Sequence, residues 1–478
     1  MSRHFKYKTA EALTLDARSR GLDIRLRDDL APLAAPIEVG GRWVGNRLAI
    51  HPMEGCDGTI DGAPDVLTVR RYRRFGEGGA KLIWGEAAAV VPKGRANPRQ
   101  LLMDESHASG LAGLVEACRR SHAERWGRDD DLLIGIQLTH SGRYSALGPV
   151  LAQHHSLLDP RTVVDRTTRA TADEHTPLIS DDELDRLQDR YASAASLALR
   201  IGFDFVDLKQ CHGYLLNELL SARTRPGNYG GSFENRTRFI REVVGRIRSE
   251  NAGALIGTRL NVYDGIPYRP GGEDRTGVPC PFEPPLHSSW GMSPDDPFSP
   301  DLSEPIALVG QLRDLGVSLV SVSMGNPYTN PHLLRPFEYA PVNGYETPEH
   351  PMIGVDRHFR LAEMVQAAFP DLAVVGSGYS WLQAYLFQAG AANVGDGRIR
   401  FVGVGRASLA QPDFGRHVLL SEPLDPKRTC RTFSYCTALM RAKHNELGQF
   451  ATGCPPFDKD VYGPIWDEAK KGTARPLP

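Results

Sequence analysis

The chain has 478 residues and a formal net charge of −2, from 56 lysines and arginines against 58 aspartates and glutamates. This near-neutral balance gives no support for a nucleic-acid or anionic-membrane partner, and we expect neither. There is no run of about 18 apolar residues, so no membrane-spanning helix is expected. The N-terminus lacks an apolar stretch and the seven cysteines are widely spread, which predicts a cytoplasmic protein with reduced thiols.

Short apolar runs alternate with helical patterns along most of the chain. Residues 1–35 are polar and mixed, which predicts a surface extension. Ile37–Val44 alternates around a Gly-Gly pair, which predicts a hairpin able to close the bottom of a barrel. The expected strands are 48–53, 81–84, 132–138, 203–208, 254–260, 317–322, 372–375 and 399–404, and the expected helices are 64–78, 107–124, 180–200, 232–250, 301–315, 355–369, 380–389 and 407–420.

Eight strand-then-helix units predict an α/β fold, a (β/α)8 TIM barrel with a hairpin plug, long βα-loop insertions and a C-terminal extension. An open doubly wound sheet is the alternative, but no Gly-x-Gly-x-x-Gly sequence follows an early strand. We expect an N-terminal extension over 1–35, the barrel over 36–422, and an extension packed on the barrel over 423–478.

Three irregular segments, residues 142–177, 263–300 and 326–351, each follow an expected strand. Segments in that position share one face of a barrel, so we expect them to lie together there. Long loops on one face are usually lids over a functional site. Insertions without a function are the alternative.

Reactive side chains gather where the fourth expected strand ends. Lys209, His212 and Tyr214 lie within six positions, directly after an apolar run. Each can hold an anion or exchange a proton, and α/β barrels carry their chemistry at the C-terminal ends of strands. A buried core tyrosine, and a structural lysine paired with Asp207 or Glu86, are the alternatives.

Further motifs follow other strands in a characteristic order. They are Asn46-Arg-Leu-Ala-Ile-His-Pro-Met53, Gln137-Leu-Thr-His-Ser-Gly-Arg143, His212-Gly-Tyr-Leu-Leu216 with Tyr229-Gly-Gly-Ser-Phe-Glu-Asn-Arg236, and Val404-Gly-Arg406. With these motifs the chain resembles the old yellow enzyme family of flavin mononucleotide (FMN)-dependent oxidoreductases. The likeness runs from about Ile37 to Leu420. It is nearer the branch of trimethylamine dehydrogenase and 2,4-dienoyl-CoA reductase, but that branch's nucleotide-binding domains are not expected here.

The resemblance implies FMN as the cofactor and assigns residues to its parts. Strand-end glycines with an arginine would hold the phosphate, an amide would face the pyrimidine edge, and a second arginine would stabilise negative charge near N1. Simple turns and a structural ion pair are the alternatives. The phosphate would be held by Gly376, Ser377, Gly378, Gly405 and Arg406. The pyrimidine edge would face Gln137, and the negative charge near N1 would be stabilised by Arg259. The ring would lie along Pro52, Met53 and Ala87.

Two positions depart from the family pattern. Glu54 stands where the family usually has Thr or Cys, so an ionised carboxylate would lower the flavin reduction potential unless it points away. The family uses two side chains to donate hydrogen bonds to the substrate carbonyl oxygen. Lys209 stands in place of the first of these donors, and His212 matches the second. Because lysine carries a full charge, it favours a more anionic acceptor oxygen or a substrate carboxylate. Tyr214 matches the family's proton donor.

Cys430, Cys436 and Cys454 follow the expected barrel. The related branch holds a [4Fe–4S] cluster there with a Cys-x2-Cys-x3-Cys motif and a fourth Cys. Here the spacing is Cys-x5-Cys-x17-Cys, and Phe433 stands at one ligand position. Reduced structural cysteines are therefore favoured, with a cluster, or zinc with His444 as fourth ligand, as alternatives.

The combined expectation is an enzyme that uses FMN and NAD(P)H to reduce an activated C=C bond of a small molecule, as a homo-oligomer. In this reaction hydride leaves flavin N5 and Tyr214 supplies the proton. The alternatives are an FMN-dependent dehydrogenase or amine demethylase working oxidatively, and a flavin-binding electron-transfer partner. The sequence does not determine the substrate.

Overall fold

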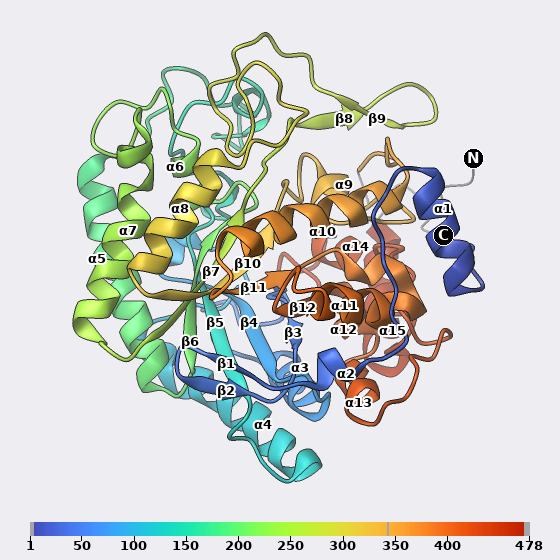
Figure 1. The fold of residues 1–478 in the computed structure, drawn as a ribbon. Helices are drawn as coiled ribbons and strands as arrows, with labels where there is room; N and C mark the ends of the chain where they lie inside the picture. Colours follow the sequence, from blue (N-terminus) through green and yellow to red (C-terminus); the bar gives the residue numbers. More distant parts are fainter. Residues whose placement is uncertain (1–3, 342–343, 473–478) are drawn as a thin grey trace.

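The computed structural model describes residues 4–341 and 344–472, and Figure 1 shows the fold. Its centre is a closed barrel of eight parallel strands that follow one another around the barrel in chain order. The predicted (β/α)8 fold is therefore confirmed. The strands are β3 (Leu48–Ile50), β4 (Leu82–Ala89), β5 (Leu133–Thr139), β6 (Phe205–Gln210), β7 (Leu255–Asn261), β10 (Val317–Ser323), β11 (Ala373–Gly376) and β12 (Phe401–Val404).

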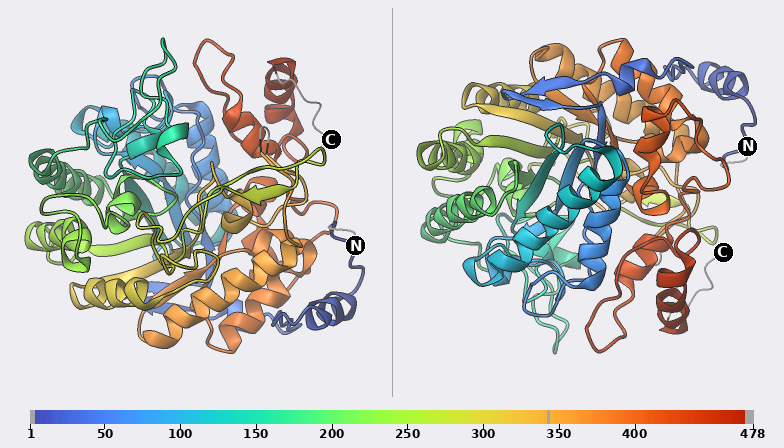
Figure 2. Two further views of the ribbon diagram at one scale, coloured as in Figure 1. Left: turned by 90° about the horizontal axis from the view of Figure 1, so that it is seen from above. Right: turned by 90° about the horizontal axis from the view of Figure 1, so that it is seen from below.

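Helices surround the barrel (Figures 1 and 2). Ser180 and Glu183 form a capping box at the start of the helix that follows the first long segment, as their spacing in the sequence suggests. The helices packed on the barrel are α3 (Val66–Glu77), α4 (Ala108–Trp126), α5 (Asp181–Arg200), α7 (Phe233–Glu250), α8 (Ser303–Asp314), α10 (Pro351–Ala368), α11 (Leu386–Gly395), α12 (Arg406–Ala410) and α13 (Phe414–Leu419).

The last two units differ from the predicted helices. The helix expected over 380–389 is a 3₁₀ helix at Tyr379–Tyr385, kinked at Gln383, that leads into α11. The helix expected over 407–420 is divided into α12 and α13. Pro412 lies between them, and a proline cannot donate the backbone hydrogen bond that would continue a helix.

The barrel strands bury side chains on both of their faces. Trp84 and Phe205 point inward and meet edge to face, with ring centroids 5.2 Å apart. Outward-facing residues such as Ile83 and Val206 belong to the larger core between strands and helices. Because both faces are covered, the strands read as continuous apolar runs rather than as an alternating pattern.

The predicted hairpin consists of β1 (Ile37–Val39) and β2 (Arg42–Val44), which pair antiparallel. Its two glycines have φ angles of +55° and +80°, as a tight two-residue turn of this type requires. Val39 and Val44 pack against inward-facing residues of the barrel strands. The hairpin therefore closes the amino-terminal end of the barrel (Figure 1).

The three long segments contact one another, as predicted, over the carboxyl ends of the strands (Figure 2). Tyr144 and Tyr328 stack with ring centroids 4.2 Å apart, which joins the first segment to the third. Arg161 donates a hydrogen bond to the carbonyl of Tyr268 at 3.2 Å, which joins the first to the second. The second segment contains the short hairpin β8 (Tyr268–Pro270) and β9 (Gly277–Pro279).

The segment after the barrel folds back onto the loop that follows β3. It contains α14 (Tyr435–Arg441) and α15 (Lys459–Ala469). The N–H of Thr452 donates to the carbonyl of Gly55 at 2.6 Å, and Arg70 of α3 pairs with Asp458 at 2.8 Å. The domain boundaries at 35/36 and 422/423 stay predictions. Within residues 4–341 and 344–472, no helix is both long and apolar enough to cross a membrane.

Buried histidines make the fold sensitive to acid. Burial lowers the pKa of His332 to about 3 and that of His140 to about 4. In an unfolded chain a histidine has a pKa of about 6.5. Each buried histidine therefore makes its full contribution to the free energy of unfolding above pH 6.5. This contribution is lost as the pH falls toward the folded-state pKa, because only the unfolded state takes up the proton in that range.

We expect the free energy of unfolding to fall by about 1.4 kcal/mol per pH unit for each such histidine between pH 6.5 and 5. Urea unfolding followed by circular dichroism measures this slope. His332→Asn should make the slope shallower, whereas the same change at the exposed His175 should leave it as in the wild type. Identical slopes in all three proteins would contradict the role of burial.

Candidate active site

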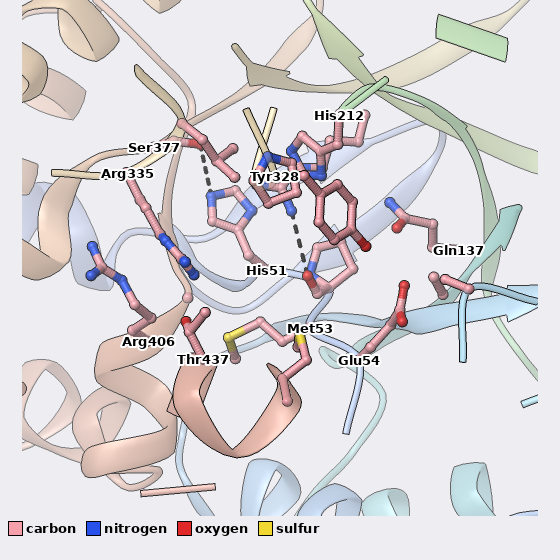
Figure 3. Close-up of a pocket in the computed structure, with 18 of the residues that line it drawn as sticks. His51, Met53, Glu54, Gln137, His212, Tyr328, Arg335, Ser377, Arg406 and Thr437 are labelled. Atoms are coloured by element: carbon pink, nitrogen blue, oxygen red, sulfur yellow. Dashed lines mark hydrogen bonds between the residues drawn. The ribbon is translucent and has the colours of Figure 1, made fainter. Parts of the chain in front are cut away.

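A cavity of about 620 Å³ lies at the carboxyl ends of the barrel strands (Figure 3). Its volume is typical of sites for small molecules and cofactors. The wall is built from strand ends, from the segments after β5 and β10, and from the C-terminal segment. Residues more than 300 positions apart in the chain therefore meet here.

The structure brings all but one of the sequence-predicted site residues to this wall. Gly376 is the exception, since it is buried within β11 next to Ile399. The residues on the wall are Pro52, Met53, Glu54, Ala87, Gln137, Lys209, His212, Tyr214, Arg259, Ser377, Gly378, Gly405 and Arg406.

The turn after β11 is held in place by its neighbours. Gly378 has a φ of +95°, and a Cβ atom there would lie 2.9 Å from the Cβ of His358. Ser377 donates its hydroxyl to the carbonyl of Val322 at 3.0 Å and also lies 3.0 Å from Nε2 of His51. His51 must then donate from Nε2. Burial lowers the pKa of His51 well below its usual value, so its ring is neutral.

Asp207 organises the floor of the cavity. This buried carboxylate accepts hydrogen bonds from the Gln137 amide at 2.5 Å, from the Trp84 indole at 2.8 Å and from the backbone N–H of Arg259 at 2.6 Å. Gln137 is thereby oriented at the cavity wall. The Arg259 guanidinium lies on the same cavity wall and donates weakly, at 3.4 Å, to the carbonyl of Pro52.

Lys209 faces the cavity and contacts two of its other residues. Its Nζ lies 3.7 Å from Oε1 of Glu54 and 3.7 Å from the centre of the Tyr214 ring. Its ion-pair partner is therefore Glu54, not the Asp207 or Glu86 that the sequence suggested. Burial lowers the pKa of Lys209, and the Glu54 carboxylate opposes that shift.

Glu54 points into the cavity, so the alternative in which it points away is wrong (Figure 3). Its Oε2 accepts a hydrogen bond from the Asn97 amide at 3.0 Å. Its Oε1 lies 3.4 Å from the hydroxyl of Tyr214. This carboxylate therefore links Lys209 to the tyrosine.

Tyr214 is the N-cap residue of α6 (Leu215–Leu220) and is almost completely buried. Its hydroxyl lies 3.2 Å from that of Tyr328. Burial, and then the nearby Glu54 carboxylate, raise the pKa of Tyr214 well above its usual value. The phenol therefore carries its proton across the neutral pH range, as a proton donor must.

His212 has an uncommon backbone conformation. Its φ is +68°, a left-handed value that is seldom seen outside glycine and that often occurs at functional sites. Its Nε2 lies 2.9 Å from Oγ of Ser323. Burial and the charges of Arg259 and Lys209 lower the pKa of His212 well below its usual value. The neutral ring has one N–H. If the Ser323 hydroxyl donates to Nε2, that N–H is on Nδ1 and is available to a ligand.

Sequence reasoning missed the second arginine at one end of the cavity. Arg335 and Arg406 lie side by side there, opposite Gln137 and Glu54 (Figure 3). Both have buried guanidinium nitrogens without a hydrogen-bond partner among the described residues. Burial and the charges of Arg406 and Arg441 lower the pKa of Arg335 to about 9. Such converging cations form a site for an anion.

The rim residues were also missed. Tyr144 and Tyr328 form an aromatic wall from two of the long segments. Arg441 and Lys443, at the end of α14, complete the wall from the C-terminal segment. The long segments lack hydrophobic periodicity, but Tyr328 and Arg335, each next to a proline, could have been noted as candidates.

The three C-terminal cysteines line a second cavity of about 200 Å³, with Arg406 between it and the first. His444 lies elsewhere, against Phe450. Among residues 4–341 and 344–472, no group of three or more His, Cys, Asp or Glu side chains is placed to hold a metal ion. The role of Cys430, Cys436 and Cys454 as reduced structural cysteines stays a prediction.

Comparison with known proteins identifies the family. The sequence model of the NADH:flavin oxidoreductase / NADH oxidase family matches residues 32–274, which is half of the chain. The chain belongs to this family. The matched region contains the first five barrel strands and the residues from Pro52 to Arg259 on the cavity wall.

Curated relatives in this flavin oxidoreductase family are NADPH dehydrogenases. That of Halalkalibacterium halodurans is 31% identical over 243 residues, which cover 49% of this chain and 64% of the relative. That of Bacillus pumilus is 29% identical over 301 residues, which cover 61% of this chain and 73% of the relative. The chain thus matches about two thirds of the length of such relatives.

Two solved structures share the fold of this family member. An old yellow enzyme homologue from Zymomonas mobilis has a TM-score of 0.56 and 20% identity, covering 83% of this chain and 94% of that one. A 2-naphthoyl-CoA reductase in complex with 2-naphthoyl-CoA has a TM-score of 0.66 and 17% identity, covering 92% and 58%. At these identities the likeness concerns the fold.

The cavity of this family member fits FMN. The unpartnered nitrogens of Arg335 and Arg406 fit a phosphate dianion. At the other end the Gln137 amide offers polar groups to a pyrimidine edge, and Arg259 lines the same cavity. Met53 lies on the wall between these ends, where an apolar ring system would run (Figure 3).

Proposed function

We propose that the protein is an FMN-dependent oxidoreductase that takes reducing equivalents from NADPH or NADH and reduces an activated C=C bond of a small molecule. The observation that carries this proposal is the position of Tyr214. A buried, protonated phenol lies in the same cavity as the residues that fit FMN and beside the donors Lys209 and His212.

When bound, FMN would supply the hydride that goes to the β-carbon of the substrate. The chain's own residues would supply the rest. Lys209 and His212 would donate hydrogen bonds to the substrate carbonyl oxygen, on which negative charge develops. Tyr214 would transfer its hydroxyl proton to the α-carbon and regain one from solvent. Asp207 would keep Gln137 and Arg259 oriented.

Glu54 gives one reason to consider oxidative amine chemistry, since a carboxylate in the cavity could bind an ammonium group. The position of Lys209 opposes this, because its Nζ lies 3.7 Å from the same carboxylate and would repel a second cation. We therefore favour the reductive direction. A cytoplasmic location and a homo-oligomeric state stay predictions from the sequence.

Anaerobic absorbance spectroscopy of the purified protein tests the proposal. We expect the yellow flavin absorbance to bleach with NADPH or NADH and to return when 2-cyclohexen-1-one is added. Bleaching that no conjugated carbonyl compound reverses would favour the dehydrogenase alternative. Absorbance unchanged by both nucleotides would favour an electron-transfer partner, and a colourless protein would contradict all three functions.

A further inference from the structure

We propose that Asn217 and Asp264 are positioning residues that hold His212 in its place at the cavity wall. The inference rests on the proposed function, in which His212 donates a hydrogen bond to the substrate carbonyl oxygen. It also gives a task to the second long segment, residues 263–300. None of the described residues of that segment lines the first cavity, so its effect on the reaction is indirect.

His212 and Gly213 form an uncommon turn between β6 and α6. Both have left-handed φ angles, +68° and +72°. The ψ angle of His212 sets the direction of the next backbone N–H. The group that binds the Gly213 N–H therefore also fixes the backbone from which the His212 ring projects. That group is Oδ1 of Asn217, which accepts the hydrogen bond at 2.7 Å.

Asn217 is the third residue of α6 and is almost completely buried. In a capping box the third helical residue binds the N–H of the N-cap residue, but here it reaches one position further back, to Gly213. Its Nδ2 donates to the two oxygens of Asp264, at 3.1 Å and 3.5 Å. A flipped amide would set Oδ1 against this carboxylate, so Asp264 determines which end of the amide faces Gly213.

Asp264 is itself held by the elements around it. It lies at the start of the second segment, and its backbone N–H donates to the carbonyl of Trp290, further along that segment, at 3.0 Å. Its Oδ1 accepts from the Asn261 amide at the end of β7 at 2.8 Å. Its carbonyl accepts from the Asn330 amide of the third segment at 2.9 Å. The carboxylate therefore connects these segments to the His212 turn.

The His212 ring has a second contact, since its Nε2 lies 2.9 Å from Oγ of Ser323. This contact can set the rotation of the ring, but the position of its Cα depends on the backbone turn. Both must be correct for a ring N–H to meet a substrate oxygen, because a misplacement of about 1 Å can lower a rate roughly 100-fold.

The first arm of the test measures flavin reoxidation by 2-cyclohexen-1-one in FMN-loaded Asn217→Leu. Leucine has nearly the size of asparagine but no acceptor, whereas alanine would enlarge the adjoining cavity of about 40 Å³ and could admit a water in place of the amide. We expect the rate to fall by roughly 10- to 100-fold. In the His212→Ala background the same change should cost little more, because a residue that acts through His212 then has nothing to position.

The second arm exchanges the two partners. Asn217→Asp sets two carboxylates against each other and should also slow reoxidation. Adding Asp264→Asn reverses the pair, so that position 217 accepts from the Gly213 N–H and from the amide at position 264. This double variant should regain most of the wild-type rate. Asn251→Leu is the control, because Asn251 donates to Ser196 on α5, outside the cavity, and it should keep the wild-type rate.

The third arm needs no turnover. Mass spectrometry measures amide hydrogen exchange of the peptide that contains Gly213. We expect exchange there to be roughly 2- to 10-fold faster in Asn217→Leu, the effect of one lost hydrogen bond, and to return toward the wild-type rate in the double variant. A protein with this exchange pattern that reduces no conjugated carbonyl compound would contradict the proposed function and leave the positioning of the turn intact.

Three results would overturn the proposal: a wild-type rate in Asn217→Leu, losses from Asn217→Leu and His212→Ala that add in full, or no recovery of rate and exchange in the double variant. The first would mean that Ser323 alone fixes the ring, and the second that Asn217 supports the whole site. Should Asn217→Leu not fold, the comparison of Asn217→Asp with the double variant decides, because both keep an acceptor for Gly213.

Discussion

Tyr214→Phe is expected to slow reoxidation of the flavin by a conjugated carbonyl compound by roughly 100- to 10,000-fold, the usual contribution of a positioned general acid. The change removes only the hydroxyl, which lies 3.4 Å from Glu54 and 3.2 Å from Tyr328. Reduction by NADPH or NADH requires no proton from this residue and should keep its rate. Anaerobic stopped-flow spectroscopy measures the two half-reactions separately.

The comparison between half-reactions controls for damage to the fold. Tyr263→Phe is a second control, because its hydroxyl donates to the carbonyl of Pro297 in a lid segment, outside the cavity. This variant should retain both rates. If Tyr214→Phe slowed both half-reactions to the same extent, the hydroxyl would serve the structure of the site and not proton transfer.

Arg71→Leu is expected to lower the free energy of unfolding by about 3–5 kcal/mol. Arg71 is buried between the carboxylates of Asp57 and Glu86, and removing it leaves two negative charges without a cation. Glu86 also accepts the backbone N–H of Gly55 at 3.0 Å, so the loop that carries Glu54 should loosen too. Urea unfolding measures the first effect, and the FMN dissociation constant measures the second.

Arg73→Leu is the matched control on the same helix. Arg73 pairs with Glu77 at 3.4 Å on the surface, where such a pair contributes about 0.5 kcal/mol or less. The control should therefore unfold at nearly the wild-type urea concentration. A similar loss of unfolding free energy in both variants would mean that the buried group of Asp57, Arg71 and Glu86 adds no more stability than a surface ion pair.

The barrel could be predicted because its strands are buried on both faces and its helices have one apolar face. The ends of the elements were less predictable. β4 was expected to end at Trp84 but continues to Ala89, with a register shift between Trp84 and Ala87. Glu86 interrupts the apolar run there because it turns outward to Arg71, a partner that sequence periodicity does not reveal.

The candidate site was predictable where its residues lie in local motifs. Lys209 lies near the end of β6, and His212 and Tyr214 follow that strand, so their meeting requires only that the strand exists. The Lys209–Glu54 pair was not predictable, because it joins two strands. Arg335 and Arg441 were missed for a related reason, since they come from segments whose positions depend on contacts with one another and not on a repeating pattern.

The floor and the rim of the cavity differ in what they tolerate. Floor residues share partners, as when the Asp207 carboxylate binds three donors at once, so a change in one disturbs the others. Rim residues come from separate segments that follow β5, β10 and α13. Because the rim segments contact one another, natural variation is expected to change them together and to leave the floor intact. Related chains should diverge in ligand preference through the rim, while keeping the same chemistry below it.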